Sequence, residues 1–164
     1  MDLLEEALQD KLPEVAVSFF VVFSRFECAM KRSGTYAKGD DKGVEADWDR
    51  LAGDMGKAFF DQAVAAGVAP VLIGAPPKKQ VKSADGTLGW RNMGAVKNVE
   101  DLFLAIRRAR NNLIHGGKYQ DDGSGHPNLV DGAERSDALL RQSMAIMRAV
   151  LESRPDLRDG YFKY

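Results

Sequence analysis

Cysteine is almost missing from this chain of 164 residues, in which Cys28 is the only one. No disulfide can form within the chain, and we expect no cysteine-based metal site. Long apolar runs are missing too: the longest, from Val15 to Phe23, is interrupted by Ser18 and falls well short of the ~20 residues of a membrane span. The first residues are acidic, where a secretory signal would be basic. We therefore expect a cytoplasmic protein that does not enter a membrane.

A strong excess of charge of either sign is also lacking. Lys and Arg number 23, Asp and Glu number 24, and the net charge is −1. This balance excludes a protein-wide basic field of the histone kind, although it leaves room for a local basic patch. Hydrophobic residues make up 45% and charged residues 29%, which are globular values. The length then indicates a single domain over residues 1–164.

Apolar residues recur at three- and four-residue spacing in four segments, which predicts main helices at about 15–32, 46–66, 99–115 and 133–153. A shorter helix is predicted over 3–12, before Pro13. Residues 67–97 form a long insertion rich in proline and glycine, in which Asp85-Gly86 favours a hairpin turn. The predicted fold class is all-α: a bundle of four main helices with a short N-terminal helix and a long loop insertion.

The first main helix is apolar nearly all round. Val17, Phe20 and Val21 lie off the stripe that its other apolar residues form. Such a helix suits either the centre of a core or an interface between subunits.

The third main helix carries the most informative stretch, RRARNNLIHGGKY, over residues 107–119. Arg110 lies at the edge of its apolar face, where an unpaired charge would be very costly. Its partner is therefore either an acid of this chain, such as Glu27, or a phosphate, which arginine binds bidentately. Arg107 and Arg108 point elsewhere, as a solvated face or as phosphate contacts.

His115 ends this helix, because two glycines follow it at once. It is either a simple helix cap or a group that exchanges protons, since its ordinary pKa of about 6.5 lies near neutrality. Arg110 and His115 are five residues apart, so an unbroken helix sets them about 140° apart. Either the glycines let His115 swing, or a second subunit brings the pair together.

The pattern Arg110-Asn111-x3-His115 resembles the arginine–polar–x3–histidine motif of HEPN domains (higher eukaryote and prokaryote nucleotide-binding). HEPN proteins are bundles of four main helices with the motif at the end of a late helix. Residues 24–27 (SRFE), Trp48 and the Pro76-Pro77-Lys78 loop are similar to a small HEPN subfamily of plasmids and phage-defence loci. The resemblance extends from about Phe19 to the fourth helix.

Many HEPN proteins are metal-independent ribonucleases that act in toxin–antitoxin or antiviral defence systems. They usually dimerise so that two motifs face each other. The resemblance thus implies a homodimer with a composite active site, Arg110 and His115 as catalytic residues, RNA as substrate, an antitoxin or defence partner, and neither metal nor cofactor. Gly117 stands where HEPN toxins inactivated by a nucleotidyltransferase carry a tyrosine, so control by that route is not implied.

The expected reaction is attack of the RNA 2′-hydroxyl on the neighbouring phosphate, which leaves 2′,3′-cyclic phosphate ends. We expect His115 to transfer the protons and Arg110 to stabilise the negative charge on the phosphate oxygens. The residues predicted to bind RNA or support the site are Asn111, Asn112, Lys118, Arg108, Tyr119 and Glu27. The alternative is a non-catalytic HEPN module that binds RNA, a nucleotide or a partner protein, which the near-neutral charge favours.

Overall fold

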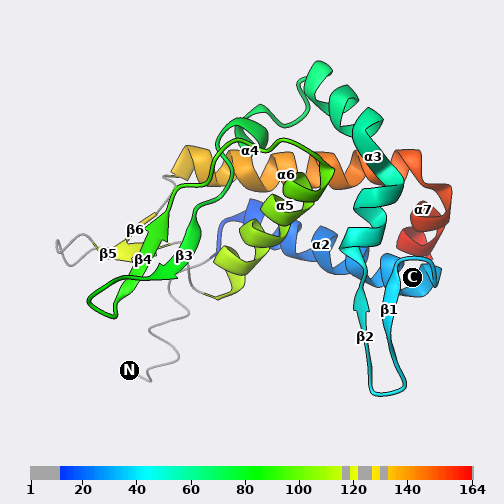
Figure 1. Ribbon diagram of the computed structural model, residues 1–164, viewed down its shortest axis with the longest axis horizontal. Helices are drawn as coiled ribbons and strands as arrows, with labels where there is room; N and C mark the ends of the chain where they lie inside the picture. The colour runs from blue at the N-terminus through cyan, green and yellow to red at the C-terminus, as the bar shows by residue number, and fades with distance from the viewer. Residues whose placement is uncertain (1–11, 116–118, 122–126, 130–132, 164) are drawn as a thin grey trace.

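The computed structural model describes residues 12–115, 119–121, 127–129 and 133–163. Its helices are α2 (Glu14–Ser33), α3 (Trp48–Ala65), α4 (Pro70–Gly74), α5 (Val99–Ile114), α6 (Ala133–Ser153) and α7 (Pro155–Phe162). Its strands are β1 (Ala37–Asp40), β2 (Gly43–Ala46), β3 (Lys79–Lys82), β4 (Leu88–Arg91), β5 (Tyr119–Asp121) and β6 (Pro127–Leu129). The described residues are thus mostly helical, and their strands pair as three antiparallel hairpins (Figure 1).

The four main helices lie where the apolar spacing predicts them. The insertion at 67–97 is not only loop, because it contains α4 and the β3–β4 hairpin. The predicted turn in that hairpin is confirmed, and Gly86 adopts a φ of 86° there. The sequence pattern does not predict the β1–β2 hairpin or α7. The predicted helix over 3–12 falls on residues that the structure does not describe, apart from Leu12.

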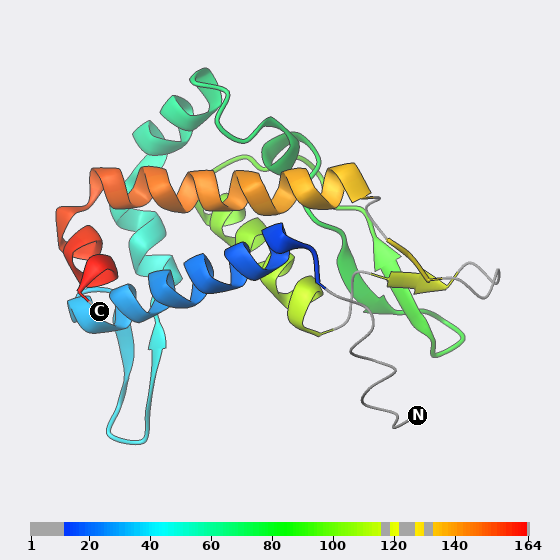
Figure 2. The same ribbon diagram turned by 180° about the vertical axis from the view of Figure 1, so that it is seen from behind.

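Helices α2 and α6 lie side by side along the molecule, and α7 turns back onto the end of α2 (Figures 1 and 2). Phe19, Phe23 and Phe26 of α2 are almost fully buried in the core between these helices and α5. Burying each such ring contributes about 1.5–3 kcal/mol. The β1–β2 hairpin projects from the helices, at the opposite end of the molecule from β3–β4.

The outer face of α2 is not covered. Val17, Phe20 and Val21 are 50%, 51% and 47% exposed. The interpretation of α2 as a core helix buried on all sides is therefore wrong for the single chain. The inward apolar stripe of α2 packs in the core, and its outward apolar residues are exposed to solvent.

Tyr36 closes the base of the β1–β2 hairpin. Its side chain is fully buried, its hydroxyl donates to Asp54 Oδ2 at 3.0 Å, and its carbonyl accepts from the Asp47 N–H at 2.8 Å. The Arg154 guanidinium lies 5.2 Å from the centre of its ring. Burial, followed by the hydrogen bond to Asp54, raises the pKa of Tyr36 to about 12. The projecting hairpin is thus anchored to α3 and to the start of α7.

Helix α3 is kinked at Gly56, whose φ of 64° and ψ of −175° are not helical. This backbone conformation is accessible essentially to glycine alone. No atom lies within 4 Å of the position that a Cβ would take at Gly56 or at Gly53, one turn earlier. The two glycines therefore differ in backbone conformation and not in available space.

Gly56→Ala is expected to lower the free energy of unfolding by about 1–3 kcal/mol, because alanine must adopt a strained backbone at the kink. Gly53→Ala places the same methyl group on helical backbone and is expected to stabilise the fold by up to about 1 kcal/mol. Urea denaturation of both variants measures the difference. Equal effects of the two substitutions would contradict a kink that depends on Gly56.

Candidate functional site at the end of helix α5

Helix α5 carries Arg110 on helical backbone and ends at Ile114, and His115 follows as its C-cap with a φ of −94° and a ψ of 25°. The Asn98 side chain caps the start of α5 by accepting from the Asp101 N–H at 2.8 Å. At its end the His115 N–H still donates to the Asn111 carbonyl at 2.9 Å, so the last turn is closed. Each side chain therefore points about 100° around the axis from the one before it.

Arg110 lies against α2. Its guanidinium carbon is 5.1 Å from the centre of the Phe23 ring, a cation–π arrangement. Its Nε is buried and has no hydrogen-bond partner. Within the described part of the chain, no carboxylate forms an ion pair with Arg110. The site therefore holds a half-buried cation with an unused donor.

Glu27 does not neutralise Arg110. Its carboxylate accepts instead from Trp48 Nε1 at 2.8 Å. The Trp48 ring stacks on Phe23 and Phe26, with centroids 5.7 and 5.4 Å away, and meets Phe103 edge-on at 5.5 Å. Glu27 therefore affects Arg110 only indirectly, by orienting the indole that supports Phe23.

His115 is exposed at the helix end. Ideal helical spacing sets His115 about 140° from Arg110, and His115 is the C-cap that follows the last helical residue. Neither is sealed in the core, since Arg110 is only half-buried.

A polar depression of about 310 Å³ lies between α5 and the β3 strand. Counted around the helix, His115 lies about 20° from Arg108 and about 40° from Asn111. The residues lining the depression are Lys79, Gln80, Leu104, Arg107, Arg108, Asn111 and Asn112. Sequence reasoning does not predict Gln80, because its strand joins the site only through the fold of the insertion.

Three side chains hold the Pro76-Pro77-Lys78 loop, which leads into β3, each by donating a hydrogen bond to a backbone carbonyl. Arg135 donates to the Pro76 carbonyl at 3.0 Å, and Arg108 donates to that of Pro77 at 3.4 Å. Asn112 donates to the carbonyl of Lys78 at 3.0 Å. The predicted supporting residues Arg108 and Asn112 thus position the loop, and the side-chain amide of Asn112 is buried in doing so.

Arg108 is half-buried beneath this loop. Burial lowers the pKa of its guanidinium from the ordinary value, and the nearby Arg91 cation lowers it further, whereas Asp101 opposes the shift. Arg108 stays protonated at any ordinary pH. The depression therefore keeps the cations of Arg107, Arg108 and Lys79.

Two of the predicted supporting residues cannot be placed. Lys118 lies outside the described residues, and the side chain of Tyr119, at the start of β5, is also outside them. In the described ranges, no group of three or more His, Cys, Asp or Glu side chains could hold a metal ion. None of the described helices is long and apolar enough to cross a membrane.

Comparison of the chain with family models, curated proteins and solved structures finds no match. Its function must therefore be inferred from α5 and from the elements packed against it.

Proposed function

We propose that this chain is a metal-independent endoribonuclease of the HEPN type. One observation carries the proposal: the buried Nε of Arg110 has no partner, although the guanidinium is held in place against Phe23. A half-buried guanidinium with an unused donor suits an anion that is supplied from outside the chain. The phosphate of an RNA backbone is such an anion, and the exposed His115 lies one turn further along the same helix.

The reaction needs two proton transfers and stabilisation of charge. A base takes the proton of the RNA 2′-hydroxyl, whose oxygen attacks phosphorus, and an acid protonates the departing 5′-oxygen as the P–O5′ bond breaks. A neutral histidine serves as the base and a protonated one as the acid. Arg110 stabilises the negative charge that builds up on the phosphate oxygens. The products carry a 2′,3′-cyclic phosphate and a 5′-hydroxyl.

A second copy of the chain is part of the proposal. Ideal helical spacing sets Arg110 and His115 about 140° apart around α5, so one protomer does not aim both at one phosphate. The exposed outer face of α2 offers a surface for pairing, since Phe20 lies one turn from Phe23, whose ring holds Arg110. A pair of chains would supply two histidines for the two proton transfers.

The polar depression supplies a path for the rest of the RNA. Lys79 and Arg107 line it. With the reacting phosphate near His115, neighbouring phosphates would lie against these cations. The substrate is therefore single-stranded or loop RNA, whose backbone can follow a short groove. We place the enzyme in a cytoplasmic toxin or antiviral-defence setting, with an antitoxin or another defence protein as partner.

Cleavage of a single-stranded RNA in EDTA tests the proposed activity. We expect cleavage with 2′,3′-cyclic phosphate ends, and we expect an RNA of the same sequence with 2′-O-methyl groups to resist, because it lacks the attacking hydroxyl. Products with 5′-phosphate ends, or a requirement for a divalent metal, would contradict the mechanism.

The polar depression also predicts how RNA binding depends on salt. In a His115→Ala background, which should prevent cleavage, Lys79→Gln with Arg107→Gln is expected to weaken RNA binding. The slope of log K against log salt should fall by about 0.7 for each phosphate that the variant no longer neutralises. Lys42→Gln with Arg50→Gln removes the same charge from exposed sites elsewhere and should change the slope little. Equal effects of the two pairs would contradict a specific path for RNA.

A non-catalytic module that binds RNA, a nucleotide or a partner protein is the second candidate. The separation of Arg110 and His115 around α5 favours it, because an isolated protomer does not direct both at one phosphate. A protein that stays monomeric and binds RNA without cleaving it would support this alternative.

A further inference from the structure

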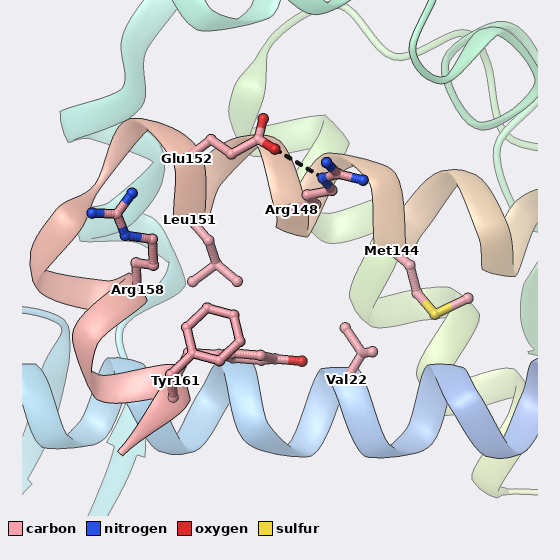
Figure 3. Close-up of a pocket in the computed structure, with 8 residues that line it drawn as sticks. Val22, Met144, Arg148, Leu151, Glu152, Arg158 and Tyr161 are labelled. Atoms are coloured by element: carbon pink, nitrogen blue, oxygen red, sulfur yellow. Dashed lines mark hydrogen bonds and ion pairs between the residues drawn. The ribbon is translucent and has the colours of Figure 1, made fainter. Parts of the chain in front are cut away.

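A second depression, unrelated to the arginine–histidine motif, lies between α2, α6 and α7 (Figure 3). Its volume of about 580 Å³ falls in the range of roughly 300–1,000 Å³ that is usual for small-molecule pockets. Its apolar lining comes from all three helices and consists of Val22, Met144, Leu151, Tyr161 and Phe162. Phe162 lines the pocket although its side chain is 69% exposed. The single chain therefore leaves part of this apolar lining, above all Phe162, in contact with water.

Charged residues surround this apolar lining, and most of them are positive. Arg148 and Glu152 form an ion pair at 2.8 Å on one side of the pocket (Figure 3). Arg158 lines the other side, and none of the ion pairs in the described residues includes it. Arg25 stands 5.8 Å from the centre of the Tyr161 ring. The charged residues that line the pocket are thus two arginines and one glutamate.

These two depressions suit different ligands. The one beside α5 is lined by amides and cations, as a sugar–phosphate backbone requires. The one between α2, α6 and α7 offers few polar groups below its rim, so a ribose or a base edge placed there would lose water without gaining hydrogen bonds. An aliphatic or aromatic body, in contrast, gains from covering the exposed ring of Phe162 and the half-buried side chain of Met144.

We propose that the pocket between α2, α6 and α7 binds a small amphipathic anion, an aliphatic or aromatic carboxylate. Its apolar body lies on Leu151 and Met144, and its carboxylate meets Arg158 at the rim. Arginine suits this role because its planar fork binds both oxygens of a carboxylate. The ion pair with Glu152 leaves Arg148 less available, so Arg158 is the principal anchor. This proposal does not depend on ribonuclease activity.

Isothermal titration of the purified protein with decanoate, below the concentration at which it forms micelles, tests the proposal. We expect one saturable site per chain. Decyltrimethylammonium has a similar apolar body with the opposite charge, and we expect it to bind at least tenfold more weakly. Equal binding of the two probes would overturn the proposal, because the pocket would then be an unselective apolar surface. Absence of decanoate binding would overturn it as well.

Two matched variants then locate the site. Arg158→Met is expected to weaken decanoate binding roughly tenfold or more, because it removes a charge-assisted hydrogen bond. Arg141→Met makes the same change on the exposed surface of α6, outside the pocket, and should leave binding unchanged. Both arginines are exposed, so neither change should affect folding, which circular dichroism checks. Equal affinities of the two variants would place the ligand elsewhere and overturn the proposal.

Discussion

His115→Ala is expected to reduce RNA cleavage about 10²- to 10⁴-fold, the usual contribution of a general acid or base. The side chain is exposed at the end of α5, and only its backbone closes the last helical turn. Alanine keeps that backbone hydrogen bond. We therefore expect the substitution to remove proton transfer while leaving the fold and the affinity for RNA nearly unchanged.

The measurement is the rate of cleavage in EDTA, compared with binding of the same RNA in its 2′-O-methyl form. His126→Ala is the matched control, because His126 is the only other histidine of the chain. A variant at His115 that cleaves as fast as wild type would refute its proposed role. Loss of both binding and cleavage would indicate damage to the site and not removal of a proton carrier.

Trp48→Ala is expected to produce the largest loss of stability, about 3–5 kcal/mol of the free energy of unfolding. The indole is 3% exposed and contacts aromatic rings of both α2 and α5. Its removal leaves a cavity where three helices meet, and it leaves the Glu27 carboxylate without its indole donor. The support beneath Phe23, and hence the position of Arg110, is removed at the same time.

Urea denaturation measures this loss, and two other variants show where it comes from. Trp90→Ala removes the same side chain from a half-buried position in the β3–β4 hairpin and should cost much less. Glu27→Gln keeps an oxygen that accepts from the indole, so its cost should stay near or below about 1.5 kcal/mol. A Trp48 variant no less stable than the Trp90 variant would contradict the central place of this ring in the core.

Apolar spacing is sufficient to predict the main helices, because α2, α5 and α6 each bury one long stripe. The β1–β2 hairpin leaves no such signal: all its strand residues except Ala37 and Ala46 are exposed, so no alternation of apolar and polar residues marks it. Helix α7 escapes prediction for a different reason. A proline after an apolar stripe indicates the end of a helix, whereas Pro155 occupies the first turn of a new one, where its missing N–H costs nothing.

Only the part of the candidate site that lies on α5 can be predicted from the sequence. Helical spacing places Arg110 at the edge of the apolar face, and in the structure it is half-buried against Phe23. Spacing does not predict that Phe23 lies beneath the guanidinium, nor that Glu27 bonds to an indole 21 positions further along the chain. Such partners depend on how separate helices pack. The polar depression is beyond prediction as well, because it forms only when the insertion folds onto α5.

The packing of α2 against α6 and α7 has a consequence for biosynthesis. Helix α2 is synthesised early, yet its phenylalanine stripe is covered in large part by helices that leave the ribosome about a hundred residues later. At roughly 5–20 residues per second, Phe19, Phe23 and Phe26 remain uncovered for several seconds. During that time these aromatic side chains of the nascent chain are exposed to solvent. Such an exposed apolar surface is a natural target for a ribosome-associated chaperone. The fold can close only after α7 has emerged.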